Sequence, residues 1–181
     1  MHAQKVPSGQ ARRLALAILA GTWVATGPAS LNAQTSIRTD GSLGRAPISV
    51  PGSRSTIAIQ GNGGQKFNVP GNVFTVTEQM GRVAGANLFH SFQQFSIGTG
   101  DAALFTASTP GLQHVISRVT GGERSAIHGL LSLQAANSRP DFYLINPAGV
   151  IFGTGAQIDV PAGFHVSTAQ RLTFAVASCG A

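Results

Sequence analysis

Carboxylates are the side chains of this protein most suited to chemistry, because paired acids cleave glycosides and clustered acids bind calcium. The chain has six, and no two lie within four positions of each other: Asp40, Glu78, Asp101, Glu123, Asp141 and Asp159. This spacing disfavours a catalytic or calcium-binding site. One exception stays open, because Asp141 and Asp159 are 18 positions apart and a chain that coils with a similar period would bring them together.

Other catalytic and ligand-binding patterns are scarce. Four histidines lack the spacing of metal ligands and lie beside apolar residues: His90, His114, His128 and His165. The chain has no Gly-x-Ser-x-Gly, His-Glu-x-x-His or phosphate-loop motif, and residues 61–64 (Gly-Asn-Gly-Gly) are typical of a loop. Four phenylalanines are expected to pack in a core rather than to stack on a sugar or a base: Phe89, Phe92, Phe95 and Phe105. We expect no enzymatic activity, no cofactor and no metal.

Residues 1–33 are organised like a cleavable secretory signal peptide. Lys5, Arg12 and Arg13 form a basic region, and an uncharged apolar run follows over residues 14–24. A run of about 11 residues is too short to span a membrane, which takes ~20. Cleavage after residue 33 would remove three basic residues and no acidic one, which lowers the formal net charge from +6 to +3. The remaining arginines are scattered, so we expect no nucleic-acid partner.

The rest of the chain is predicted to be an all-β domain. Only 10% of the residues are charged and 43% are hydrophobic, which disfavours a helical bundle. Short apolar runs bounded by turn residues recur from residue 67 to residue 176, and few hairpin signals separate them. We therefore favour a parallel β-helix with about seven coils of ~20 residues each. The predicted parts are an N-terminal cap or extended region (residues 34–66), a β-helical domain (67–176) and an irregular tail (177–181), and the single Cys179 excludes an intramolecular disulfide.

An ordered set of motifs carries a family resemblance. It begins with Asn87-Leu-Phe-His-Ser-Phe-Gln-Gln-Phe-Ser-Ile97, Ile116-Ser-Arg-Val-Thr-Gly-Gly122 and Ile127-His-Gly129. It continues with Phe142-Tyr-Leu-Ile-Asn-Pro-Ala-Gly-Val-Ile-Phe-Gly153 and Phe164-His-Val-Ser-Thr-Ala169. In order and separation these motifs resemble the two-partner secretion domain at the N-terminus of filamentous haemagglutinin-like exoproteins. The family's hallmark Asn-Pro-Asn-Gly-Ile is Asn-Pro-Ala-Gly-Val here, at residues 146–150, and its Asn-Pro-Asn-Leu motif is missing.

The hallmark pattern also has a local structural meaning. Asn at the first position, Pro at the second and Gly at the fourth favour a type I turn, and the Asn side chain can bond nearby backbone groups. The sequence therefore predicts a turn over residues 146–149, between apolar strands at 142–145 and 150–152. Ala148 preserves this turn but removes an Asn side chain, which matters only if that side chain contacts a partner.

The resemblance implies a right-handed single-stranded parallel β-helix that serves as a secretion signal. The Sec translocon would deliver the chain to the periplasm of a Gram-negative bacterium. An outer-membrane β-barrel transporter with periplasmic recognition domains would then export it to the cell surface or extracellular space. The residues expected to carry recognition are Asn146, Pro147 and Gly149 of the turn, and Asn87, Phe89, His90, Phe92 and Phe95 of the earlier segment.

Two other functions stay open at this point. One is a short surface adhesin that itself binds a host surface or a carbohydrate, and the other is a β-helical polysaccharide-active enzyme. Members of the family usually continue into a long adhesin, haemolysin or toxin passenger. A fragment, an interrupted gene and a free-standing secretion domain are therefore all compatible with the 181 residues.

Overall fold

The computed structural model describes residues 34–170. The signal peptide predicted for residues 1–33, the end of the predicted β-helical domain (residues 171–176) and the tail predicted at residues 177–181 lie outside the described residues. Within residues 34–170 the chain forms strands and turns, with one three-residue 3-10 turn, η1 (Glu78–Met80). This part of the chain contains no helix of the length and apolarity that a membrane span requires.

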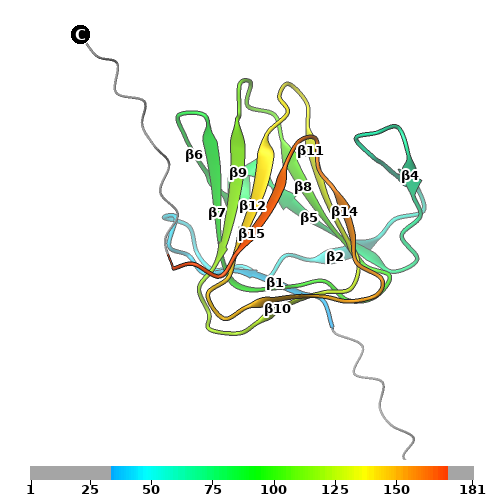
Figure 1. Cartoon of the computed structure of the whole chain (residues 1–181), viewed down its shortest axis with the longest axis horizontal. Helices are drawn as coiled ribbons and strands as arrows, with labels where there is room; N and C mark the ends of the chain where they lie inside the picture. Colours follow the sequence, from blue (N-terminus) through cyan, green and yellow to red (C-terminus); the bar gives the residue numbers. More distant parts are fainter. Residues whose placement is uncertain (1–33, 171–181) are drawn as a thin grey trace, which may run out of the picture. The chain divides into compact units, whose positions relative to one another are not determined.

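Two sheets built mainly of parallel strands, together with one short sheet, form the walls of a β-helix (Figure 1). The A sheet consists, in spatial order, of β1 (Ser36–Thr39), β7 (Asn87–Ser96), β9 (His114–Val119), β12 (Asp141–Ile145) and β15 (Phe164–Ser167), with β6 (Arg82–Ala84) beside β7. The B sheet consists of β14 (Gln157–Asp159), β11 (Leu130–Ala135), β8 (Ala102–Ala107), β5 (Asn72–Thr77) and β2 (Gly52–Arg54). The short sheet pairs β10 (Ser125–Ile127) with β13 (Val150–Phe152).

Each coil visits the B sheet, then the A sheet, then the short sheet. Asn87 pairs with His114 and His114 with Asp141, so the first two coils take 27 residues each along the A sheet. The last interval is shorter, since Phe142 pairs with Phe164, 22 residues further on. The β-helix is therefore confirmed, but the prediction of about seven coils of ~20 residues is wrong, because the structure has about three turns. The coils are longer because irregular corners at residues 108–113, 120–124 and 136–140 join the strands, and they are fewer because residues 34–66 add no coil.

Side chains that alternate inward along the parallel strands fill the space between the walls. Phe92 and Phe95 of β7, Phe105 of β8 and Phe142 of β12 are at most 1% exposed. The ring centroids of Phe105 and Phe142 are 4.8 Å apart in an edge-to-face arrangement, which is favourable for aromatic pairs. Core packing is thus confirmed for Phe92, Phe95 and Phe105, whereas Phe89 is half-buried on the outer surface of the A sheet.

The segment before the first coil pairs in the opposite direction to the coils. β1 and β6 run antiparallel along the edge of β7 that faces away from β9. β2 runs antiparallel to β5 on the edge away from β8. A hairpin of β3 (Ile59–Gln60) and β4 (Lys66–Phe67) packs on the outer surface of the B sheet. The boundary at residues 66 and 67 and the domain division built on it remain predictions.

Candidate functional site

The hallmark turn forms between β12 and β13. The Gly149 amide donates to the Asn146 carbonyl at 2.9 Å, which closes a four-residue turn over residues 146–149. Gly149 has a φ of 114°, a conformation that favours glycine. Ala148 has no positive φ, so the turn is not type II and agrees with the type I turn that the sequence predicts.

The side chain of Asn146 points inward and joins two coils. It is 1% exposed, and its Oδ1 accepts a bond from the Ala148 amide at 2.9 Å. Its Nδ2 donates to the Glu123 carbonyl and to the Ser125 Oγ, both at 2.9 Å, and these acceptors belong to the preceding coil. Asn146 therefore satisfies buried polar groups of the fold, as buried amides generally must.

Only the outer part of the turn is accessible to a partner. Pro147 is exposed, and Ala148 and Gly149 are half-buried. Beside them lies a groove of about 240 Å³, whose lining includes Arg118, Thr120, Pro147 and Gln170. The groove has a cationic side chain and hydroxyl and amide groups, which suit the binding of a polar peptide segment rather than acid–base catalysis.

The earlier predicted segment occupies β7, with β9 between it and β12. Asn87 lies at the start of β7 on the outer surface, and its Oδ1 is 3.0 Å from the Nδ1 of His114. Phe89 is half-buried, while His90, Phe92 and Phe95 are buried. The segment and the hallmark turn thus belong to one sheet but lie two strands apart, and the structure does not bring them into a single surface site.

His90 lies in an apolar part of the core. Its ring centroid is 5.4 Å from that of Phe105 and 6.0 Å from that of Phe92. Burial lowers the pKa of His90 to about 4, although the Thr77 carbonyl and the charge of Glu78 act in the opposite direction. Nε2 is 3.3 Å from the Thr77 carbonyl, and Nδ1 has no hydrogen-bond partner among the described residues. The ring is therefore neutral at pH 7 and is enclosed where a partner of the folded domain has no access.

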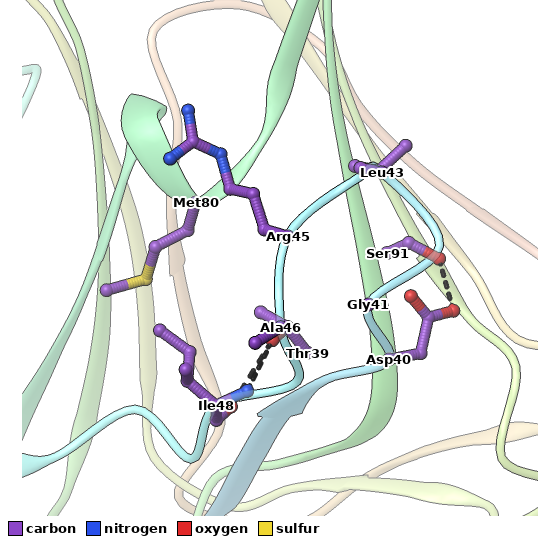
Figure 2. A pocket seen from close by; sticks show the side chains of 9 residues that line it. All are labelled: Thr39, Asp40, Gly41, Leu43, Arg45, Ala46, Ile48, Met80 and Ser91. Atoms are coloured by element: carbon purple, nitrogen blue, oxygen red, sulfur yellow. Dashed lines mark hydrogen bonds between the residues drawn. The ribbon is translucent and has the colours of Figure 1, made fainter.

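A second polar site, which the sequence analysis did not single out, joins the N-terminal segment to the coils. Asp40 follows β1, and its Oδ2 accepts bonds from Ser91 at 2.6 Å and from Thr120 at 2.7 Å. Asp40, Ser91 and Met80 line a cavity of about 20 Å³, and Figure 2 shows how these side chains lie around it. This volume holds about one water molecule and no sugar.

The ionisation of Asp40 follows from these contacts. Partial burial raises its pKa, but hydrogen bonds from Ser91, the Ser42 amide and Thr120 outweigh this effect and hold the pKa at about 2. The carboxylate is therefore ionised at all physiological pH values. In the sequence, the Asp40-Gly41 pair predicts only a turn at this position. The bonds of Asp40 to Ser91 and Thr120 could not be predicted, because these partners lie more than 50 residues away and leave no local pattern.

The two acids that remained open for catalysis lie apart. Asp141 begins β12 in the A sheet, where its Oδ1 accepts a bond from the Gly163 amide at 2.7 Å and its Oδ2 is 3.9 Å from His165. Asp159 ends β14 in the B sheet, and its Oδ2 accepts a bond from Ser132. Residues 34–170 contain no group of three or more His, Cys, Asp or Glu that could hold a metal ion. The coils therefore do not create the carboxylate pair of a glycosidase from these two residues.

Comparison with protein families agrees with this architecture. The family model of the TPS secretion domain matches residues 55–178, which cover the hairpin, every described coil and the hallmark turn. Comparison with curated proteins gives no match. The match covers well over half of the chain, and TPS domains of secreted exoproteins are not an enzymatic family. The protein thus belongs to the TPS secretion domain family, the two-partner secretion domain of haemagglutinin-like exoproteins.

Proposed function

We propose that the chain is the secretion-signal domain of a filamentous haemagglutinin-like exoprotein and that a partner outer-membrane β-barrel transporter recognises it. Residues 1–33 direct the chain through the Sec translocon, and the transporter's periplasmic domains then bind the secretion domain. The domain folds at the surface of a Gram-negative bacterium as a right-handed β-helix preceded by a cap over residues 34–66. The observation that carries this proposal is the family match over residues 55–178.

Family membership itself supplies the coarser part of this account. A TPS secretion domain implies a secreted exoprotein of a two-partner system, with a transporter as the second partner. The finer steps rest on physical arguments. Right-handed crossovers between parallel strands are strongly preferred, and stacked coils fold by adding each new coil to the one before it. A chain that emerges from a pore end first suits such stepwise folding.

The burial of the candidate residues separates two modes of recognition. Asn146, Phe92 and Phe95 are at most 1% exposed in the folded domain, so a transporter can contact their side chains only before the coils form. Pro147 is exposed and Phe89 is half-buried, so a folded domain can present them. Because the buried residues outnumber the exposed ones, we propose that recognition precedes folding.

The test is secretion of the full chain by Gram-negative cells with and without the partner transporter. We expect the chain in the medium only when the transporter is present. Equal release without the transporter contradicts the proposed function.

A matched pair of substitutions then tests recognition of the turn. Asn146→Ala and Ser125→Ala both remove the bond between Asn146 Nδ2 and Ser125 Oγ. Asn146→Ala also removes the bonds to the Glu123 carbonyl and the Ala148 amide and changes the hallmark motif, so the free energy of unfolding of both variants is measured beside their secretion. We expect Asn146→Ala to reduce secretion strongly and Ser125→Ala to leave it nearly unchanged. Equal secretion of both variants would mean that Asn146 serves the fold alone.

A further inference from the structure

The β3–β4 hairpin connects the start of the described chain to its last coil. We call residues 59–67 the strap. Ile59 and Phe67 of the strap pack on the outer surface of the B sheet, against Val73, Ala102 and Leu130. These three side chains pair in register across β5, β8 and β11, so the strap crosses three successive coils. Figure 1 shows the strap outside the B sheet, on the side of β14.

The tip of the strap binds a buried carboxylate of the last coil. Asp159 of β14 is 3% exposed, and its Oδ1 accepts a bond from the Asn62 amide at 3.0 Å and one from Gln65 Nε2 at 3.4 Å. Ser132 of β11 donates to its Oδ2 at 2.9 Å. The strap thus supplies two of the three donors that satisfy this carboxylate. A buried carboxylate without such donors is costly.

The side chain of Asn62 strengthens the same connection. Its Nδ2 donates to the Leu133 carbonyl at 2.9 Å and to the Asp159 carbonyl at 3.4 Å. One residue of the strap therefore bonds to β11 and to β14 at once. Gly61 lets the strap fold tightly, because a Cβ there would meet the Phe67 ring at 2.6 Å.

Space remains between the strap and the B sheet at both ends. A cavity of about 360 Å³ lies between Gln60–Asn62 and the ends of β8 and β11, and one of about 240 Å³ lies between Phe67–Pro70 and the starts of β8, β11 and β14. The strap is therefore held by the apolar contacts of Ile59 and Phe67 and by the polar contacts of its tip. Segments with few buried contacts open first in native proteins.

The contact between the strap and Asp159 joins an early segment of the chain to a late one. Asn62 and Asp159 are 97 positions apart, so the strap leaves a pore first while its carboxylate partner belongs to the last described coil. We propose that the strap closes on the B sheet only when β14 has joined the stack, and that its closure on Asp159 completes the fold. The order in which the two segments leave a pore rests on the proposed function, whereas the closure of the strap on Asp159 is a property of the folding chain and holds whichever transporter exports it.

Hydrogen exchange of the purified full chain tests the role of Asp159. We expect Asp159→Ala to accelerate exchange in the strap by roughly ten- to hundredfold, the loss expected from bonds to a charged acceptor, while amides of β7 and β9 keep their protection. Asp141→Ala is the matched control, because it removes a carboxylate that accepts an amide bond in the A sheet instead. Unchanged strap protection in Asp159→Ala, or equal acceleration in the strap and in β9, overturns the proposal.

A second variant and a kinetic measurement make the test independent of how well Asp159→Ala folds. Asn62→Ala removes the bonds of the strap side chain and leaves the coils intact, so it must also expose the strap selectively. In refolding of the unaltered chain with pulsed exchange labelling, strap amides must gain protection no earlier than the amides of β14. Protection of the strap before β14 would show that it closes without the last coil and would overturn the proposal.

Discussion

The two ends of the described coil stack differ in whether another strand pairs with their outermost strands. At the N-terminal end, β1, β6 and β2 lie antiparallel on the edges of β7 and β5. Ile37 and Val50 there are 2% and 4% exposed. At the C-terminal end, β13, β14 and β15 have no further strand beside them within residues 34–170. Ile151, Phe152 and Val166 there are 41–48% exposed.

The difference explains why further coils can be added at one end of the described stack and not at the other. A parallel edge presents unpaired backbone groups to which another coil can add. Antiparallel strands satisfy those groups and place polar side chains outside, as the terminal repeats of solenoid proteins do. Within residues 34–170, the N-terminal end is therefore covered by antiparallel strands, and the C-terminal end has the strand edges and the apolar surface on which a further coil can stack.

The largest expected contrast comes from one substitution made at each end. Ile37→Ala removes a buried side chain of β1 and is expected to lower the free energy of unfolding by about 2–5 kcal/mol. Ile151→Ala, in half-exposed β13, should change it by less than about 1 kcal/mol. Urea denaturation of both variants measures the difference. Similar losses would mean that Ile151 is covered in solution and that the C-terminal end is not open.

Acid should destabilise the fold through His90, in the coil next to the N-terminal end. His90 has a folded pKa of about 4 against an ordinary value of about 6.5 in the unfolded chain. The unfolded state therefore binds the proton more readily, so stability is complete above about pH 6.5 and falls as the pH drops towards 4. A shift of this size corresponds to up to about 3 kcal/mol.

His90→Phe should remove this pH dependence. Thermal denaturation between pH 7 and pH 4 measures this variant against the unaltered chain. Glu78 is the charged group that acts on His90, so Glu78→Gln should make the loss slightly steeper. An unaltered pH profile in His90→Phe would assign the acid sensitivity to another group.

A smaller effect is expected from the carboxylate that fastens the N-terminal segment. The folded pKa of Asp40 lies below its unfolded value, so its contribution is complete above about pH 4 and disappears as the pH falls to about 2. Because the carboxylate is only partly buried and solvent screens its interactions, we expect Asp40→Asn to cost only about 1 kcal/mol at pH 7.

Chemical denaturation at pH 7 and at pH 2 measures this contribution, which should vanish at the lower pH. Asp141→Asn, near the open end, is the control and should leave β1 protected from hydrogen exchange. Loss of β1 protection in both variants would show that the N-terminal segment depends on the whole stack rather than on Asp40.

Local patterns in the sequence were enough for several features of the fold and the candidate site. Short apolar runs between turn residues predicted the strands, and the order of motifs predicted the family. Asn146, Pro147 and Gly149 predicted the turn, because a type I turn depends on the preferences of four adjacent residues. The same patterns misjudged the coil length, since irregular corners have no periodic signal.

The sequence by itself determined the all-β class, the family and the turn, because each depends on neighbouring residues or on an ordered set of motifs. Only the tertiary structure decided that Asn146 bonds to Ser125, that Asp159 binds the strap and that Asp40 joins β1 to the coils. It also decided that His90 faces the core while Asn87 faces outward. These outcomes depend on which residues far apart in the chain come into register, and a shift of one residue reverses the side of the sheet on which every side chain lies.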